Sequence, residues 1–454
     1  MNLRKSTFPI MIFAYAGSII YLSYYSVQDS LVSILVPGFI ACLSFYILYS
    51  RQLQEPTTFR FIQFIILIKL TLIFAIPNLS NDFYRFWWDG YLSSHGINPY
   101  LWSPTEILVQ SHTQHVRNAL EVQYNQLNSP EYHTVYPLLS QLIFCISAKI
   151  AGTHLHIFSI ILKLFVLLAD LGILFFSIKI LRQLKRPLKY ILLFFGNPLC
   201  IMELNNNLHF EVFLILFLAL SIYYTLHSKV FLSGLSIGFS FISKLTSLLL
   251  LPLFIQWPFF KKYNILIIIG FLFPTLLFIA YLIPGLYGYQ KSMGLYFHQF
   301  EFNSLLYGPI SNYFDIHKWY LLKPKIGIYL MSIFLLIYCI ILIYNWVSNK
   351  SYFSFKHAWL ILFFYLIFSS TVHPWYITPI LFLSCFVFPL SSFAWSFLIL
   401  FSYARYDSYF INYEPILLYL EYAIVLILLI YELHKQQHKN MQNEFDIKNT
   451  AHLQ

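Results

Sequence analysis

Residues 31–49 read LVSILVPGFIACLSFYILY, a continuous apolar run without one charged side chain. An α-helix needs about 20 such residues to cross the hydrocarbon core of a bilayer. Similar apolar runs flank it at about 8–25 and 61–77, and Arg51 and Arg60 lie in the gap before the latter. A membrane β-barrel would instead show alternating segments of about ten residues. The sequence therefore predicts an all-α polytopic membrane protein.

The composition agrees with this fold class. Of the 454 residues, 59% are hydrophobic, 20% aromatic and only 10% charged, whereas a soluble domain carries about 25% charged residues. The net charge is +10, and the basic residues form short clusters between apolar runs, such as 51–60 and 179–189. Such clusters are typical of cytoplasmic loops. They do not indicate a nucleic-acid partner.

We predict 11–13 transmembrane helices in a single domain over residues 1–434, followed by a polar cytoplasmic tail at 435–454. Further spans are expected near 136–151, 155–178, 188–202, 210–224, 230–254, 265–283, 326–344, 359–370, 376–388 and 416–433. Under the positive-inside rule, 78–133 becomes a large first extracytoplasmic loop and 284–323 a second outer loop. Loops this long are usually functional or disordered, and the prolines and aromatic residues of 78–133 favour order.

Two stretches leave the span count open. If 136–151 and 155–178 both cross the membrane, the basic loop 179–189 lies outside, against the charge rule. Either one of these helices lies along the interface or the loop is an exception. The stretch 230–254 is interrupted by two glycines and by Lys244, and it could form two half-helices in a hairpin, which would put Lys261 and Lys262 inside.

The first outer loop begins with Asn-Asp-Phe-Tyr-Arg-Phe-Trp-Trp-Asp-Gly at residues 81–90. On a helix, Asp82, Arg85 and Asp89 share one face, and the aromatic residues between them are expected to enter the headgroup zone. A carboxylate at the water boundary can act as a general base, and an arginine can bind phosphate bidentately. The alternative is a self-contained ion-pair cluster. We favour a functional site, because ionisable groups at membrane depth are costly and usually functional.

Candidate phosphate ligands lie at the end of this loop and in a later span. His133 and Tyr136 precede Pro137, which suits the first turn of a helix, and a helix N-terminus attracts anions. Both could instead anchor the interface. Lys244 could reach a lipid phosphate or extend its amine toward the interface.

Other polar residues gather at the predicted outer ends of later spans. They are His209, Glu211, Asn303, His373 and Trp375. Each alone is compatible with a capped turn or an aromatic anchor, but their convergence on the face of the large loop favours a substrate site. Within one span, Lys163 and Asp170 are seven residues apart and are placed to pair. The five cysteines show no zinc-binding spacing, and we expect no metal.

At these residues the sequence resembles the bacterial polyprenol-phosphate-mannose-dependent mannosyltransferases of the GT-C fold, and more distantly the mannosyltransferases of GPI-anchor synthesis. The ordered match covers 81–100, 134–139, 197–211, 244–252, 302–303 and 373–376. The string Asp-x-Tyr-Arg-x-x-Trp-Asp-Gly is its most specific part. This chain has Glu211 and Leu138 where many relatives have Asp and Pro.

The resemblance implies an inverting glycosyltransferase in the bacterial inner membrane, with its site on the extracytoplasmic face. The donor would be a polyprenyl-phosphate sugar, most simply mannose, and the acceptor a lipid, glycan or protein. Asp82 would be the catalytic base. Charge on the donor phosphate would be stabilised by Arg85, with His133, Tyr136 or Lys244. Sugar or acceptor would be held by Asp89, His209, Glu211, Asn303, His373 and Trp375.

Three alternatives remain at this stage. A divalent metal could bridge Asp82 and a second carboxylate, although no cofactor is expected. The protein could be a transporter or flippase for a lipid-linked sugar, which predicts internal repeats and paired broken helices. It could also be a polysaccharide polymerase or ligase with a different donor.

Overall fold

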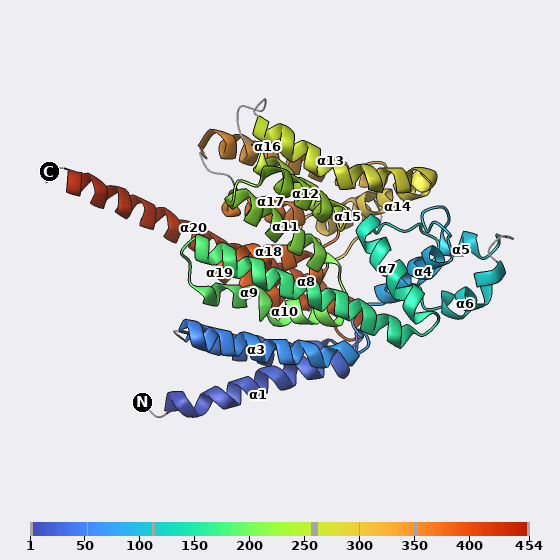
Figure 1. Cartoon of the computed structure of the whole chain (residues 1–454), viewed down its shortest axis with the longest axis horizontal. Helices are drawn as coiled ribbons and strands as arrows, with labels where there is room; N and C mark the ends of the chain where they lie inside the picture. Colours follow the sequence, from blue (N-terminus) through green and yellow to red (C-terminus); the bar gives the residue numbers. More distant parts are fainter. Residues whose placement is uncertain are drawn as a thin grey trace.

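The structure, a computed structural model, describes the backbone of residues 3–51, 53–110, 114–255, 262–298, 300–348 and 353–451. Within these ranges the regular elements are helices, and the only β pairing is an isolated bridge between Phe302 and Thr371. Most long helices run side by side along one axis, and both termini lie at one end (Figure 1). The opposite end carries α4 (Asp82–Ser94), α5 (Pro104–Ile107), α6 (Gln114–Tyr124) and α7 (Leu138–Ala151). We call it the loop end.

The bundle combines long helices with shorter apolar helices of 10–17 residues. The main elements are α1 (Leu3–Tyr24), α2 (Leu31–Ser50), α3 (Glu55–Thr71), η1 (Leu72–Phe74), α8 (Leu155–Gln183), α11 (Glu211–Leu226), α12 (Val230–Phe241), η5 (Leu245–Phe254), α13 (Lys262–Leu282), α16 (Ile326–Ser348), α17 (Phe355–Phe368) and α20 (Glu414–Ala451). In the described chain, six helical stretches are long and apolar enough to cross a membrane, and one pair bent by 112° makes up to seven. Five shorter apolar helices of 10–17 residues accompany them. The predicted all-helical membrane fold is confirmed, whereas the described residues contain six or seven stretches long enough to span, fewer than the predicted 11–13.

The helix α7 resolves the first ambiguity of the sequence. Its 14 residues extend about 21 Å at 1.5 Å per residue, which is less than the roughly 30 Å hydrocarbon core. The next helix, α8, has 29 residues, and at its end Arg182 donates to Glu55 at 2.7 Å, at the start of α3. The basic loop 179–189 therefore lies at the end of the bundle opposite the loop end, together with Arg60.

The hairpin proposed for 230–254 is confirmed. Gly234 lies against the backbone of Ile267, and Gly238 lies against that of Phe271, so α12 and α13 run parallel. The chain that connects two parallel helices must run back in the opposite direction. The ten residues of η5 form this returning segment. Lys262 begins α13, whereas Lys261 lies outside the described residues.

The described part of the first outer loop contains the helices α4, α5 and α6, but one expectation about it is wrong. Phe83, Phe86, Trp87 and Trp88 are each at most 2% exposed. They pack inside the protein rather than into lipid headgroups, because α7 covers this face of α4. The two helices approach closely at Gly90, where a Cβ atom would stand 2.3 Å from the Phe144 carbonyl oxygen.

The second outer loop and the C-terminus close the fold. The loop contains α14 (Leu286–His298) and α15 (Tyr307–Ile316), and its Phe302 pairs with Thr371. The last helix, α20, continues to Ala451 through most of the predicted polar tail, and in Figure 1 it extends beyond the bundle at the end opposite the loop end.

The expected pairing of Lys163 with Asp170 is wrong. Asp170 forms a buried ion pair with Lys69 of α3. Lys163 instead donates to the carbonyl oxygens of Leu72 and Ala75, at 3.0 and 2.6 Å, and to Asn206. Both lysines thus fasten the end of the α3–η1 stretch, from which the first outer loop departs.

Candidate active site

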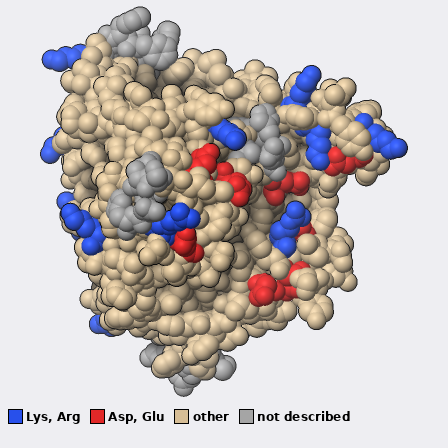
Figure 2. Space-filling view, turned by 90° about the vertical axis from the view of Figure 1, so that its right-hand side faces the viewer, with Lys and Arg blue, Asp and Glu red and all other residues tan. Residues whose placement is uncertain are grey.

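A cavity of about 540 Å³ lies among the elements that meet near the loop end. This volume falls in the range of small-molecule sites. Polar lining residues include Ser80, Asn81, Asp82, Asn128, Ser129, His209, Glu211, Lys244, Thr246, His373 and Tyr406. Apolar lining comes from η5, α16 and α17, with Leu250, Met331, Leu362 and Leu366. On the face that this end presents, acidic side chains gather toward the middle, whereas basic ones also lie at the rim (Figure 2).

Asp82 is a carboxylate that a ligand in this cavity can reach. It is the first residue of α4, and its backbone N–H donates to Ser80 Oγ at 3.3 Å. Its side chain is partly exposed and lines the cavity. Among the described residues, none forms a hydrogen bond or ion pair with the Asp82 carboxylate. A ligand in the cavity can therefore reach it.

Asp89, on the same helix face, is used differently. It is fully buried and accepts hydrogen bonds from Arg85 Nε and Gln141 Nε2, each at 2.9 Å. Asp89 does not line the cavity. The i, i+4 pair anticipated from the sequence exists, and it joins α4 to α7 instead of facing a ligand.

Arg85 and His133 line a second, smaller pocket of about 80 Å³ beside Asp82. Arg85 Nη1 also donates to the Tyr132 carbonyl at 2.9 Å, so its guanidinium joins α4 to the loop that precedes α7. His133 Nε2 lies 3.3 Å from Glu106. Burial lowers the pKa of His133, although Glu106 opposes this shift, and the ring is uncharged at neutral pH. Asp82 and Tyr136 line both cavities.

Lys244 brings a positive charge to the main cavity. It lies in the break between α12 and η5, directly before Leu245, and its ammonium pairs with Glu211. The ammonium also lies 5.0 Å from the centre of the Tyr376 ring. Lys244 is a quarter exposed, so an anion in the cavity can reach it.

Three rings form a stack on the cavity wall. The Trp375 indole lies between two imidazoles, with ring centres 3.6 Å from His209 and 4.4 Å from His373 and nearly parallel planes. Burial, followed by the nearby His209 and Lys244, lowers the pKa of His373 to about 3. Both faces of the indole are covered, so Trp375 can offer a ligand only its edge.

Asn303 is not brought to the cavity. Its Nδ2 donates to both oxygens of Glu421, at 3.3 and 3.2 Å, and Tyr422 donates to its carbonyl. The sequence placed it on the correct loop, but its amide fastens that loop to α20.

Two residues of the site were missed from the sequence. Tyr406 lines the cavity, and burial together with the charge of Asp82 raises its pKa to about 12, so its hydroxyl remains a hydrogen-bond donor. Glu203 is fully buried and lies 3.4 Å from His209 Nε2. An acidic residue inside the apolar run 199–204 was the available signal for Glu203. The described residues contain no group of three or more His, Cys, Asp or Glu side chains placed to hold a metal ion.

A helical membrane bundle with a cavity that joins an apolar wall to an available carboxylate, a lysine and stacked rings has the features of a membrane-embedded glycosyltransferase. The comparison with known families agrees. Residues 13–259, more than half of the chain, match the model described as alpha-(1->6)-mannopyranosyltransferase, N-terminal domain, and the chain belongs to this family. The predicted mannosyltransferase of the GT-C type is thereby confirmed, and the transporter alternative is not supported. Neither a curated protein nor a solved structure matches the chain.

Proposed function

We propose that this mannosyltransferase takes mannose from a polyprenyl-phosphate donor and transfers it to a hydroxyl of an extracytoplasmic lipid, glycan or protein. The observation that carries the proposal is the composition of the cavity. Its polar part contains Asp82 and Lys244, and its apolar wall belongs to α16 and α17. The outer surface of α16 exposes Ile328 and Leu336. A lipid-linked donor matches this arrangement, because its phosphate and sugar need polar partners and its tail needs an apolar path.

The reaction is a direct displacement with inversion at the anomeric carbon. The acceptor oxygen forms the new bond as Asp82 takes its proton, and the bond to the phosphate oxygen breaks with its electron pair. A well-placed base contributes about 10²–10⁴-fold. Lys244 stabilises the charge that develops on the leaving phosphate, and Tyr136 lines the same region. The leaving group is stable as an anion, so no strong general acid is needed.

The remaining side chains have supporting roles. His209, Glu211, His373 and the edge of Trp375 bind the sugar from the cavity wall. Arg85 holds the loop 132–136 beside Asp82 through Asp89 and the Tyr132 carbonyl. Its positive charge, with the His133 ring, borders the smaller pocket. We propose no metal or other cofactor.

The loop end faces away from the cytoplasm of a bacterial inner membrane. In support, the basic loop 179–189 and Arg60 lie at the opposite end of the bundle, through the contact of Arg182 with Glu55. Basic loops favour the cytoplasmic side. Donor lipid would enter laterally from the bilayer.

The proposal is tested by incubating purified enzyme in vesicles with radiolabelled polyprenyl-phosphate mannose and a membrane extract as acceptor source. Label should move to a new lipid, glycan or protein product, and a chelator should leave the rate unchanged. Nucleotide-linked mannose is the control donor and should give no product. Transfer from the nucleotide sugar alone would refute the lipid donor, and loss of transfer with chelator would refute the metal-free mechanism.

A further inference from the structure

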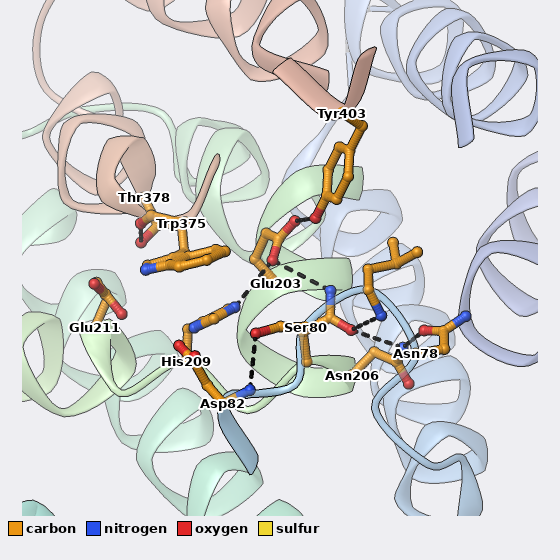
Figure 3. A network of polar contacts seen from close by, with 12 residues as sticks. Asn78, Ser80, Asp82, Glu203, Asn206, His209, Glu211, Trp375, Thr378 and Tyr403 are labelled. Carbon is orange, nitrogen blue, oxygen red and sulfur yellow. Dashed lines mark hydrogen bonds and ion pairs between the residues drawn. The ribbon is translucent and has the colours of Figure 1, made fainter. Parts of the chain in front are cut away.

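Glu203 has no part in the mechanism above, yet its carboxylate is the centre of a polar network. It lies in η4 (Ile201–Asn206), a π-helical turn, and is fully buried. Tyr403 donates to Oε1 at 2.9 Å, Asn207 Nδ2 donates to Oε2 at 3.2 Å, and His209 Nε2 lies 3.4 Å from Oε2 (Figure 3). Burying a carboxylate is costly unless it is paired, so this position calls for a reason.

The backbone brings His209 to Glu203. Leu208 has a positive φ of 66°, a conformation that bulky residues rarely adopt, and the helical segments on either side are bent by 112°. The His209 N–H donates to the Glu203 carbonyl at 3.1 Å. A π-helical turn followed by a left-handed residue is a local irregularity of the kind found at functional sites.

A ring stack and a neighbouring charge act on the imidazole of His209. Stacking on Trp375, with an angle of 12° between the rings, sets its plane. Glu203 Oε2 lies 3.4 Å from Nε2, outside hydrogen-bond geometry, and the negative charge of this carboxylate favours a proton on Nε2. The other nitrogen, Nδ1, then keeps its lone pair. Within the described part of the chain, Nδ1 has no hydrogen-bond partner, and His209 lines the cavity.

The same network reaches the segment that leads to Asp82. Asn207 Oδ1 accepts from the Leu79 N–H at 3.4 Å, and Asn206 donates to Asn78 at 2.8 Å (Figure 3). A purely structural role for Glu203 would be to fasten these elements. Such a role would not single out one hydroxyl of the sugar.

We infer that Glu203 is a positioning residue, which holds the proton on His209 Nε2 so that Nδ1 accepts a hydrogen bond from one hydroxyl of the mannose being transferred. The inference rests on the proposed function for the location of the sugar in the cavity. The carboxylate acts through His209 and does not touch the substrate.

The test measures kcat/KM for mannosyl donors that lack a single hydroxyl, at the 2, 3, 4 or 6 position. Wild-type enzyme should discriminate against one of these donors by about 10-fold or more, because a buried acceptor is left unpaired. His209→Phe keeps the ring stack and should lose that discrimination. Glu203→Gln keeps the side-chain volume and should weaken it several-fold. The matched control is Glu421→Gln, a substitution of another fully buried carboxylate that bonds Trp395 and Asn303, and it should discriminate like wild type.

Undiminished discrimination in Glu203→Gln or in His209→Phe would overturn the inference. If Glu203→Gln does not fold, Tyr403→Phe takes its place, since it frees Oε1 and should weaken discrimination by about 2-fold; no change would again overturn the inference. A wild-type enzyme that ignores the lipid-linked donor would instead refute the proposed function. The same deoxy series would then be run on the mannosyl donor that the enzyme does use.

Discussion

Replacing Asp82 with Asn separates catalysis from folding. The substitution keeps the size of the side chain but cannot accept the proton, so the rate should fall at least 100-fold. At 1.36 kcal/mol per factor of ten, this raises the barrier by about 2.7 kcal/mol or more. Among described residues the carboxylate has no partner to leave unpaired, so stability should change by less than about 0.5 kcal/mol.

Asp89→Asn is the matched control on the same helix face. Asp89 is fully buried between Arg85 and Gln141, and removing its charge leaves the guanidinium partly uncompensated. Breaking such a buried pair costs about 3–5 kcal/mol, so this variant should unfold at a clearly lower temperature. The assay combines initial rates of label transfer with thermal unfolding in detergent. An Asp82→Asn enzyme with near wild-type kcat would refute Asp82 as the base, and if both variants transfer mannose normally, the proposed mechanism is wrong.

Four further predictions concern the surroundings of the site. Arg85→Lys should lower kcat/KM by about 10-fold or more, because a lysine lacks the planar fork through which Arg85 Nε and Nη1 reach Asp89 and the Tyr132 carbonyl; near-normal turnover would contradict this. Gly90→Ala should lower the unfolding temperature by the equivalent of about 1–3 kcal/mol, since its Cβ would meet the Phe144 carbonyl, whereas Gly17→Ala, with open space around it, should not. Cysteines at Ser94 and Asn312 should react with an impermeant thiol reagent outside sealed cells, and one at Ser348 should not; labelling at Ser348 would reverse the topology. The pKa of His373 is lowered to about 3, so the unfolded chain binds a proton that the folded chain does not. The free energy of unfolding should therefore decrease by about 2 kcal/mol as the pH falls from 6.5 to 5. In His373→Gln the unfolding temperature should depend less on pH over this range.

Short-range patterns in the sequence were enough to predict much of the fold. The apolar run 31–49 is α2, and the predicted helix bearing Asp82, Arg85 and Asp89 is α4. The interruptions in 230–254 correctly indicated a hairpin. These features depend on hydrophobic length and on residues a few positions apart, which a sequence displays directly.

Partners far apart in the chain could not be predicted. Asp170 pairs with Lys69, 101 residues away, and not with Lys163 seven positions along its own helix. The aromatic residues of α4 were assigned to lipid headgroups because lipid and protein interiors are both apolar, and only the position of α7 distinguishes them. Asn303 lies on the expected loop, but the sequence does not reveal how far it stands from the cavity.

The pair formed by Glu203 and Tyr403 also has a consequence for biosynthesis. The two residues are 200 positions apart, and at about 5–20 residues per second roughly 10–40 s of translation separate them. During that interval the growing chain holds an acidic side chain among apolar helices without the hydroxyl that later satisfies it. The stretch 13–259 matched by the family model therefore contains Glu203 but not its Tyr403 partner, which is synthesised only with η9 (Ile399–Tyr406).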